Sequence, residues 1–529
     1  MAYGEDPQAY NPYTVYQNML NRQNRQEANT MMYWDWTPIK GLTATIDYAL
    51  NYYNQFSWQA NTPNQAFNFQ TNSFGSRVYV GPNAPIVNNT FTGYKTMLNG
   101  RLNYHTTIGT DHDISGMFVY SEEYWYNRFQ GASRNDRLNP GLREIDAGLT
   151  NIQSTSGYSN TEGLRSYIGR VNYTAFNRYL LEANFRVDGS SKFLPGSQYG
   201  FFPSVALGWR FTEEDFMNRL TGSFLTNGKL RVSYGTLGNN SGVGRYEQQT
   251  TLAGNPYMLG SDIVRGLVNS KLLNRDLTWE ETSVLNIGLE LGFLNNRLTA
   301  ELDYYDRLTT GMNRPSELSI LLEGAYNAPR RNIGDLRNRG IEATLSWRDK
   351  VGGIGYGVSL NASYNRTNLE QWNEFLTRGW VFLDMPYHFV YTYEDMGIAQ
   401  TWQDIYNATP QGAQPGDILR KDLNGDGRID GNDMKADTKS QRDRPTTFAA
   451  LNGYITWKGF DVSFLLQASA GRKDFWLNAF NNTNFSASRY AATWNHWTNP
   501  WSLDNRQGHG PAWVEVVITG LKQPSGWTI

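Results

Sequence analysis

The amino-acid sequence predicts an all-β protein, and more specifically a transmembrane antiparallel β-barrel. Three observations predict it: long segments of alternating apolar and polar residues, short turns that join these segments in pairs, and many aromatic residues. The 529 residues include 33 Tyr, 25 Phe and 17 Trp. Charged residues make up 18% of the chain, below the roughly 25% of typical soluble proteins.

Composition also excludes several classes of function. The formal net charge of −2 gives no sign of a nucleic-acid partner. The absence of cysteine excludes disulfides, thiolate metal sites and cysteine nucleophiles. No run reaches the roughly 18 apolar residues of a membrane helix, and the first residues show no secretory signal. Barrel strands also lack long apolar runs, because they alternate between lipid and lumen.

The alternation has a period of two residues, which is typical of a strand with one apolar face. In "LTATIDYALNYY", Leu42, Ile46 and Leu50 fall on one face, and Thr43 and Asp47 fall on the other. We expect roughly fifteen such strands, each near or above the roughly 9–11 residues that cross a bilayer when tilted. The same alternation is found in 298–307, 341–348, 356–366 and 460–471.

Short turns and long connections alternate along the chain. Turns at Asn295-Asn296 and near Asn177-Arg178 predict hairpins. Long connections on one side and short turns on the other are typical of outer-membrane barrels, as are aromatic residues at strand ends. The expected irregular stretches are 54–95, 129–162, 238–275, 312–334, 368–443 and 470–510. A large soluble β-sandwich or propeller remains an alternative to the barrel.

The stretch "KDLNGDGRIDGNDM" (421–434) matches a calcium loop of EF-hand type. Its ligands would all be oxygen atoms, which suits Ca²⁺, and Gly427 would make the sharp turn. No helices flank it, so we expect a structural staple rather than a sensor. A surface loop with a coincidental match is the alternative. The candidate metal ligands are Asp422, Asn424, Asp426, the backbone carbonyl of Arg428, Asp430 and Asp433.

The remaining candidates for chemistry do not form a catalytic constellation. Three pairs of neighbouring glutamates could suggest a glycoside hydrolase, but adjacent residues on a strand point to opposite faces. The five histidines are scattered, and "GGIGYG" (352–357) lies at a hairpin, without the context of a nucleotide loop. We therefore expect no enzyme activity. The glutamate pairs are Glu122-Glu123, Glu213-Glu214 and Glu280-Glu281.

Several segments together resemble the SusC/RagA-type TonB-dependent outer-membrane transporters of Bacteroidota. Their order and spacing cover roughly residues 30–500. The matching segments are "YLLEANFRVDGSSKF" (179–193), "GFFPSVALGWRFTEEDF" (200–216), "KLRVSYGTLGNNSG" (229–242), 277–312, "NIGDLRNRGIEATLSW" (332–347) and "GDILRKDLNGDGRIDGND" (416–433).

The resemblance implies a barrel in outer-membrane lipid that imports glycans or peptides and is driven through TonB. It also implies a SusD-like lipoprotein on the extracellular side, and transport rather than catalysis. Barrels of this kind have about 22 strands and a plugged lumen. Compared with them, we expect this chain to be partial, without the plug domain, some strands and the N-terminal part that contacts TonB.

The resemblance also predicts two regions, a barrel region at 1–508 and a tail at 509–529 outside the family pattern. A frameshift near residues 506–509 would explain the tail, and sequencing the gene tests this. Which residues bind substrate stays open. The alternative function is a soluble carbohydrate-binding β protein, stapled by calcium, with Trp and Tyr as sugar platforms. Membrane fractionation distinguishes the two.

Overall fold

A computed structural model gives the fold of the protein. It describes residues 21–61, 64–68, 73–80, 85–135, 137, 139, 142–150, 153–217, 224–269, 271–316, 328–374, 383–387, 389–441, 444–472, 502 and 504–507. None of the helices in these ranges is long and apolar enough to cross a membrane. The predicted tail at 509–529 and most of the expected irregular stretch 470–510 lie outside the described residues.

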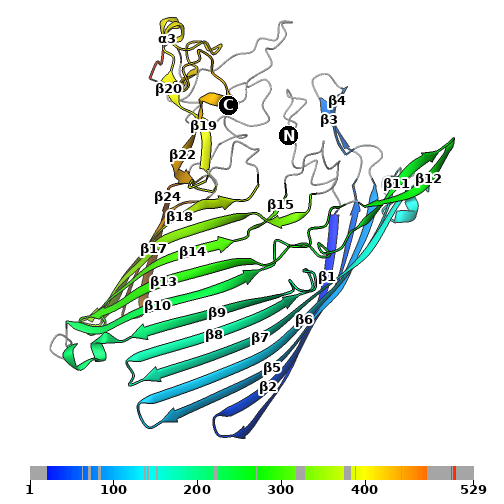
Figure 1. The fold of residues 1–529 in the computed structure, drawn as a ribbon. Helices are drawn as coiled ribbons and strands as arrows, with labels where there is room; N and C mark the ends of the chain where they lie inside the picture. Colours follow the sequence, from blue (N-terminus) through cyan, green and yellow to red (C-terminus); the bar gives the residue numbers. More distant parts are fainter. Residues whose placement is uncertain are drawn as a thin grey trace.

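One antiparallel sheet of fourteen strands dominates the structure (Figure 1). Each strand pairs with the next along the sheet, and the described residues leave β1 and β24 as its two edges. The all-β prediction is confirmed. In sheet order the strands are β1 (Asn21–Ile39), β2 (Leu42–Ala60), β5 (Ile86–Ile108), β6 (His112–Arg134), β7 (Gln153–Ala175), β8 (Tyr179–Ser190), β9 (Tyr199–Trp209), β10 (Leu225–Asn239), β13 (Glu280–Phe293), β14 (Leu298–Thr310), β17 (Gly334–Val351), β18 (Ile354–Trp372), β23 (Thr447–Trp457) and β24 (Phe460–Ala470).

At one end of the sheet, tight turns join consecutive strands. Asn295 and Asn296 have φ of 57° and 61° in the turn between β13 and β14, and Asn177 has φ of 56° between β7 and β8. Asparagine tolerates this left-handed region better than most residues. Both predicted turns are confirmed. The connection between β9 and β10 is longer and holds two 3₁₀ turns, η2 (Phe211–Glu213) and η3 (Asp215–Met217).

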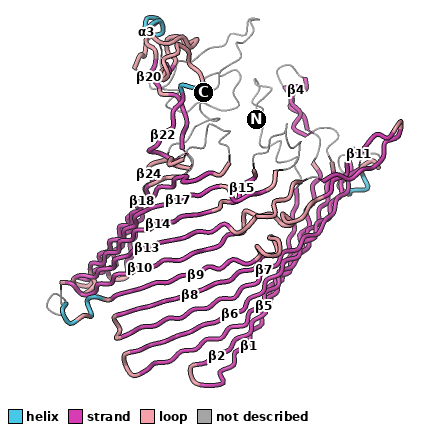
Figure 2. The backbone as a smooth tube through the Cα atoms, viewed as in Figure 1, coloured by secondary structure: helices cyan, strands magenta, loops and turns pink. Residues whose placement is uncertain are grey.

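At the opposite end, the connections are long and carry small structures of their own (Figure 2). The predicted one-sided arrangement is therefore correct. These structures are the hairpins β3 (Asn64–Asn68) with β4 (Ser73–Val80) and β11 (Leu252–Leu259) with β12 (Asp262–Asn269), the pairs β15 (Asn313–Pro315) with β16 (Arg330–Asn332), β19 (Phe389–Tyr393) with β22 (Met434–Gln441) and β20 (Asp395–Ile398) with β21 (Ile418–Arg420), the 3₁₀ turns η1 (Ile145–Ala147) and η4 (Gly431–Asp433), and the helix α3 (Trp402–Asn407).

Two sequence-based expectations need correction. Residues 54–60, 86–95, 129–134, 153–162 and 368–372 belong to β2, β5, β6, β7 and β18 and are not irregular. In 153–162 polar residues occupy both faces, so hydropathy alternation could not detect this strand end. In 54–60 the alternation is present, because Phe56, Trp58 and Ala60 share one face, and the expectation of an irregular stretch overlooked it. Glu213 and Glu214 lie at a 3₁₀ turn, so the rule that strand neighbours point to opposite faces does not apply to them.

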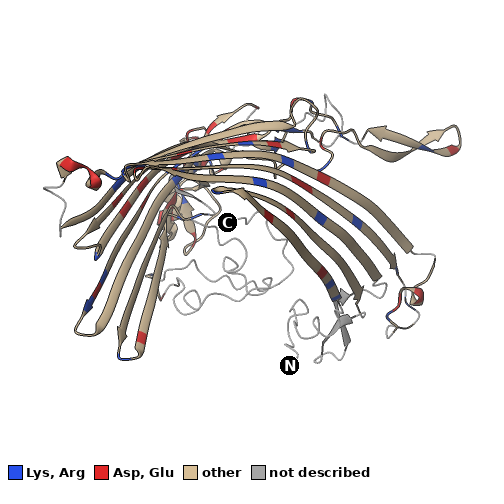
Figure 3. Ribbon diagram, turned by 90° about the horizontal axis from the view of Figure 1, so that it is seen from below, with Lys and Arg blue, Asp and Glu red and all other residues tan. Residues whose placement is uncertain are grey.

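The sheet curves into an open arc, as the view from below shows (Figure 3). Glycines lie under aromatic rings of neighbouring strands. A Cβ at Gly169 would overlap the ring of Phe185, and one at Gly453 would overlap the ring of Phe464. Rings that cover glycines in this way help fix the register of a curved sheet.

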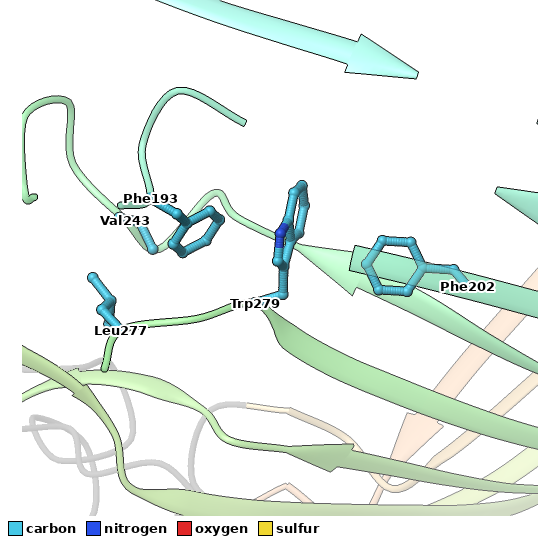
Figure 4. Close-up of a cluster of buried hydrophobic side chains, with 5 residues drawn as sticks. All are labelled: Phe193, Phe202, Val243, Leu277 and Trp279. Atoms are coloured by element: carbon cyan, nitrogen blue, oxygen red, sulfur yellow. The ribbon is translucent and has the colours of Figure 1, made fainter. Parts of the chain in front are cut away.

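A cluster of buried apolar side chains lies where the long connections meet the sheet; we call it the rim core (Figure 4). The ring centroid of Trp279 lies 5.2 Å from that of Phe193 and 5.5 Å from that of Phe202. Its indole N–H donates to the carbonyl oxygen of Gln198 at 3.0 Å. The rim core ties the connections before β9 and β13 to the sheet. Its members are Phe193, Phe202, Val243, Leu277 and Trp279.

Residues 389–441, within the connection between β18 and β23, form a lobe. Within it, helix α3 begins with a capping box: the Asp404 N–H donates to Thr401 Oγ1 at 3.3 Å, and Asp404 Oδ2 accepts the Thr401 N–H at 2.8 Å. The Gln400 N–H donates to the same carboxylate at 2.9 Å. The backbone N–H groups of Thr401 and Gln400 hold the pKa of Asp404 below its usual value.

This lowered pKa predicts a pH dependence of the helix. A carboxylate with a lowered pKa adds stability above its unfolded pKa and loses it as pH falls through the folded pKa. Amide protection over 404–408 should therefore be constant at neutral pH and fall in acid, below about pH 4. Hydrogen exchange, corrected for its intrinsic pH dependence, measures this. In Asp404→Asn, amide protection over 404–408 should already be reduced at neutral pH. Equal protection in the two proteins at neutral pH would contradict the prediction.

Candidate functional site

The two faces of the curved sheet differ in chemistry. On β18, Val358, Leu360 and Tyr364 are exposed, whereas the alternate residues Ser359 and Asn361 are half-buried. Side chains on a concave face converge and cover one another, and those on a convex face splay apart. The polar residues therefore line the concave face and the apolar ones the convex face. Paired residues of neighbouring strands point to the same face, so the next strand has the same apolar and polar faces. Leu360 pairs with Leu345, and Asn361 pairs with Thr344.

An uncharged band runs along the convex face. On β17 the convex residues between Arg339 and Asp349 are Ile341, Ala343, Leu345 and Trp347, with no charge among them. Ten residues of strand span about 33 Å, or about 25 Å at a tilt near 40°, which is the height of the apolar band of a membrane barrel.

Charged residues of both signs occur along the strands of the sheet (Figure 3), and the strand register places a group of them together on the concave face. Arg231 of β10 lies among three carboxylates of the next two strands: its Nε is 2.8 Å from Glu290, and its Nη2 is 2.6 Å from Glu301 and 2.9 Å from Asp303. Lys229 also reaches Glu290, at 3.3 Å. Sequence analysis missed this network, because the partners are distant along the chain and only the strand register brings them together.

The neighbouring glutamates of β6, Glu122 and Glu123, separate to the two faces, as expected. On β6, Glu123 pairs with Lys95 of the concave face at 2.7 Å. Glu122 points to the convex face and pairs with Arg165 at 3.0 Å. The two carboxylates cannot act on one substrate, which removes the suggestion of a glycosidase at this pair.

The candidate metal loop lies in the lobe, at the end of the sheet with the long connections. Several of its carboxylates accept backbone N–H groups of the loop itself. Asp422 accepts from Gly425 at 2.7 Å and from Gly427 at 2.9 Å, and Asp426 accepts from Arg428 at 2.9 Å. Gly427 has φ of 80°, in keeping with the predicted sharp turn.

The buried member of the loop is Asp433, whose exposed fraction is 0%. Its carboxylate accepts the Asp430 N–H and the Leu423 N–H, both at 2.8 Å. These N–H groups hold its pKa below the usual value. Asp433 therefore closes the loop by joining its beginning to its end.

The other predicted ligands lie on the loop surface. Asn424 accepts the Asp426 N–H at 2.9 Å, Asp430 accepts the Asn432 N–H at 2.8 Å, and Arg428 is exposed. In the part of the chain that the structure describes, no three His, Asp or Glu side chains converge as a metal-binding group. The donors are all oxygen atoms, which fits Ca²⁺ in chemistry. The loop is thus ordered by backbone hydrogen bonds in this structure.

Comparison with known proteins identifies the family. The model of the family described as "TonB dependent receptor-like, beta-barrel" matches residues 2–497. The chain belongs to this family. The resemblance predicted from the sequence is confirmed, and related receptor barrels are outer-membrane proteins.

Two curated relatives of this TonB-dependent receptor barrel show the extent of the similarity. TonB-dependent receptor P3 of Formosa agariphila is 29% identical over 399 residues, which are 71% of this chain and 38% of the relative. TonB-dependent receptor SusC of Bacteroides thetaiotaomicron is 28% identical over 355 residues, which are 64% of this chain and 34% of SusC. The chain therefore matches only about a third of the length of these relatives.

A solved structure agrees on the fold. The structure of the RagAB peptide transporter superimposes with a TM-score of 0.75 and 21% identity, and covers 94% of this chain and 53% of that chain. At this identity the likeness establishes the barrel fold alone. The large sheet is thus the sheet of a TonB-dependent receptor barrel.

Proposed function

We propose that the chain forms the barrel of an outer-membrane importer that takes up oligomeric nutrients, glycans or peptides, and is driven through TonB. The observation that carries the proposal is the division of the sheet into an uncharged convex band about 25 Å high and a polar concave face. A lipid-facing band of this height needs a membrane, and a polar concave face suits a hydrated substrate path.

Two further features support import rather than catalysis. The long connections lie at one end of the sheet, where a SusD-like lipoprotein would cover an importer on the extracellular side. The concave face offers carboxylates, guanidinium groups, amides and hydroxyls, which suit neutral glycans and peptides alike. Among the similar proteins, RagAB is a peptide transporter, and SusC is a TonB-dependent receptor.

Growth of the bacterium that carries the gene tests the uptake of oligosaccharides or peptides. Deletion of the gene should abolish growth on one class of oligosaccharide or peptide, and complementation should restore growth only while TonB is present. Membrane fractionation and heat-modifiable gel migration should place the protein in the outer membrane as a barrel. Recovery in the soluble fraction, with direct sugar binding, would instead support the soluble carbohydrate-binding alternative.

We also propose that the loop 422–433 holds a structural Ca²⁺. The donor set supports this, since four carboxylates and one amide lie at the spacing of a calcium loop. Each carboxylate oxygen that accepts one N–H group keeps a further lone pair. Binding requires Asp422, Asp426 and Asp430 to turn towards a common centre, while Asp433 already holds the two ends of the loop together.

Replacement of a ligand should weaken this site strongly. Asp422→Ala and Asp426→Ala should each lower calcium affinity by more than the roughly 10–100-fold that loss of an outer-shell partner costs. Isothermal titration with CaCl₂ measures the change. Asp395→Asn is the matched control, because this exposed carboxylate lies in the same lobe outside the loop. No binding by the unmodified protein up to about 1 mM, the weak end for extracellular sites, would overturn the proposal.

A further inference from the structure

A row of three aromatic side chains crosses neighbouring strands of the concave face, near the end with the long connections; we call it the aromatic row. Phe91 of β5 pairs with Phe129 of β6, and Phe129 pairs with Tyr158 of β7. The ring centroid of Phe129 lies 4.7 Å from that of Phe91 and 5.2 Å from that of Tyr158. β5, β6 and β7 lie side by side in the sheet (Figure 1). Phe129 shares the concave face with Glu123, because an even number of residues separates them on β6.

Glycines on the same face let neighbouring side chains lean along the sheet. A Cβ at Gly131 would meet Phe129 Cζ at 2.8 Å and Asn89 Oδ1 at 2.7 Å, so both side chains lie over this glycine. A Cβ at Gly93 would likewise meet Asn127 Oδ1 at 2.7 Å. Rings that cover glycines in this way are a recurrent feature of curved sheets. The Phe129 ring therefore has one side towards the backbone of Gly131, and its outer side is open to the lumen.

The surface around the aromatic row is uncharged. On the same face of β5, β6 and β7, the rows directly above and below it hold only asparagine, serine and glycine. Arg25 lies over the ring of Tyr53, 4.7 Å from its centroid, but within the described residues no such cation lies over a ring of the aromatic row. The flanking residues are Asn89, Gly131 and Ser156 on the side of the long connections, and Gly93, Asn127 and Asn160 on the other side.

The first charges beyond these rows, on the same three strands, are already paired. Lys95 lies 2.7 Å from Glu123. Glu162 lies 3.2 Å from Lys192 and 2.9 Å from Arg245. A charged ligand on the aromatic row would lose part of its hydration without gaining a partner of opposite charge, and such a loss is costly. The surface therefore favours an uncharged ligand.

The amides beside the aromatic row keep hydrogen-bonding capacity. Tyr53 donates its hydroxyl hydrogen to Asn127 Oδ1, and this bond leaves both N–H hydrogens of the Asn127 amide for another acceptor. Asn160 pairs with Asn127 in the strand ladder. Among the described residues, none makes a hydrogen bond with the Asn160 side chain. A ligand on the aromatic row therefore meets both donors and acceptors at one edge.

This combination of groups suits a sugar better than a peptide. A pyranose ring has an apolar C–H face that stacks on an aromatic ring, and its hydroxyl groups both donate and accept hydrogen bonds. An extended peptide is usually held through the free edge of a sheet. The backbone beneath Phe91 and Phe129 has no free edge, because β5 and β6 are each paired with a strand on both sides.

We propose that the aromatic row and its flanking amides bind a neutral oligosaccharide, with Phe129 and Tyr158 as the stacking surfaces. The proposal rests on the import function given under Proposed function and narrows its substrate class to neutral glycans. Tyr158 is 54% exposed and is the most open ring of the row. The row lies next to the long connections, where a substrate would enter from the extracellular side.

Isothermal titration of the detergent-solubilised protein with maltohexaose, cellohexaose, xylohexaose and mannohexaose tests the proposal. Y158A should weaken binding of the sugar that the unmodified protein binds by about 2–10-fold, the value of one aromatic contact. N160A should weaken it by a similar factor, because a hydrogen bond is lost. Y158F keeps the ring and should bind as the unmodified protein does. Hexagalacturonate and hexa-alanine, which carry charges, should bind weakly to all of them.

Tyr234 of β10 provides the matched control. It is 51% exposed, close to the value of Tyr158, but it lies on the convex face, because an odd number of residues separates it from Arg231. Y234A removes the same side chain and should leave sugar binding unchanged. Heat-modifiable migration of each variant shows separately that the barrel is folded.

Four results would overturn the proposal: no binding of these sugars by the unmodified protein up to about 1 mM, the weak end of ordinary substrate affinities, unchanged sugar binding by Y158A, an equal loss in Y234A, or binding of hexa-alanine that Y158A weakens. Failure of the import function appears elsewhere, in the fractionation of the unmodified protein and in growth that does not depend on TonB. TonB-dependent growth on peptides alone would leave import intact and contradict only the sugar site.

Discussion

Replacement of Trp279 by Ala is expected to destabilise the protein by about 3–5 kcal/mol, the range for a buried Trp or Phe cut back to Ala. Trp279 is 6% exposed and packs between Phe193 and Phe202. Its loss opens a cavity in the rim core and leaves the Gln198 carbonyl without the indole N–H. Unfolding of the detergent-solubilised protein by heat or denaturant, followed by heat-modifiable migration, measures the effect.

Trp402→Ala is the control for this prediction. Trp402 begins helix α3 in the lobe and is 68% exposed. Its removal loses the same side chain without a cavity, and surface changes of this kind are usually within about 0.5 kcal/mol. If the two variants lose the same stability, the rim core does not hold the long connections on the sheet.

The sequence predicted the large sheet well, because hydropathy alternation is strong where one face is apolar. Segments such as 341–348 were correctly predicted to be strands, because Ile341, Leu345 and Trp347 alternate with charged or hydroxyl side chains. The alternation disappears where a strand extends past the uncharged band and carries polar residues on both faces, as in 153–162. The lengths of β6 and β7 could therefore not be obtained from pattern alone.

The candidate site was predictable only in part. The calcium-type loop is local in sequence, so its residues could be named, and the sharp turn at Gly427 was expected. The concave network around Arg231 depends on register, because Glu290 and Asp303 lie 59 and 72 residues away along the chain. Arg339 and Arg366 likewise become neighbours only through the pairing of β17 with β18. Side-chain type gave no signal for either.

If the uncharged band of the convex face contacts lipid, a charged substitution in the band on β17 should destabilise the barrel. Ala343→Arg should destabilise the folded barrel in membranes by about 2–4 kcal/mol, the cost of an arginine near the bilayer midplane on the lipid face. Ala343 lies in the middle of the band, opposite Leu302 and Ala362. Urea titration of the protein in lipid vesicles, read by gel migration, measures the difference.

Thr344→Arg, one residue along the same strand, separates lipid exposure from general intolerance of arginine. Thr344 points to the concave face, opposite Glu301 and Asn361, so an arginine there gains a carboxylate neighbour and should cost little. In a soluble protein the order would differ, because an exposed alanine such as Ala343 accepts arginine with little effect. Equal stability of the two variants would therefore contradict a membrane-facing convex band, whereas a selective loss in Ala343→Arg needs lipid against this face.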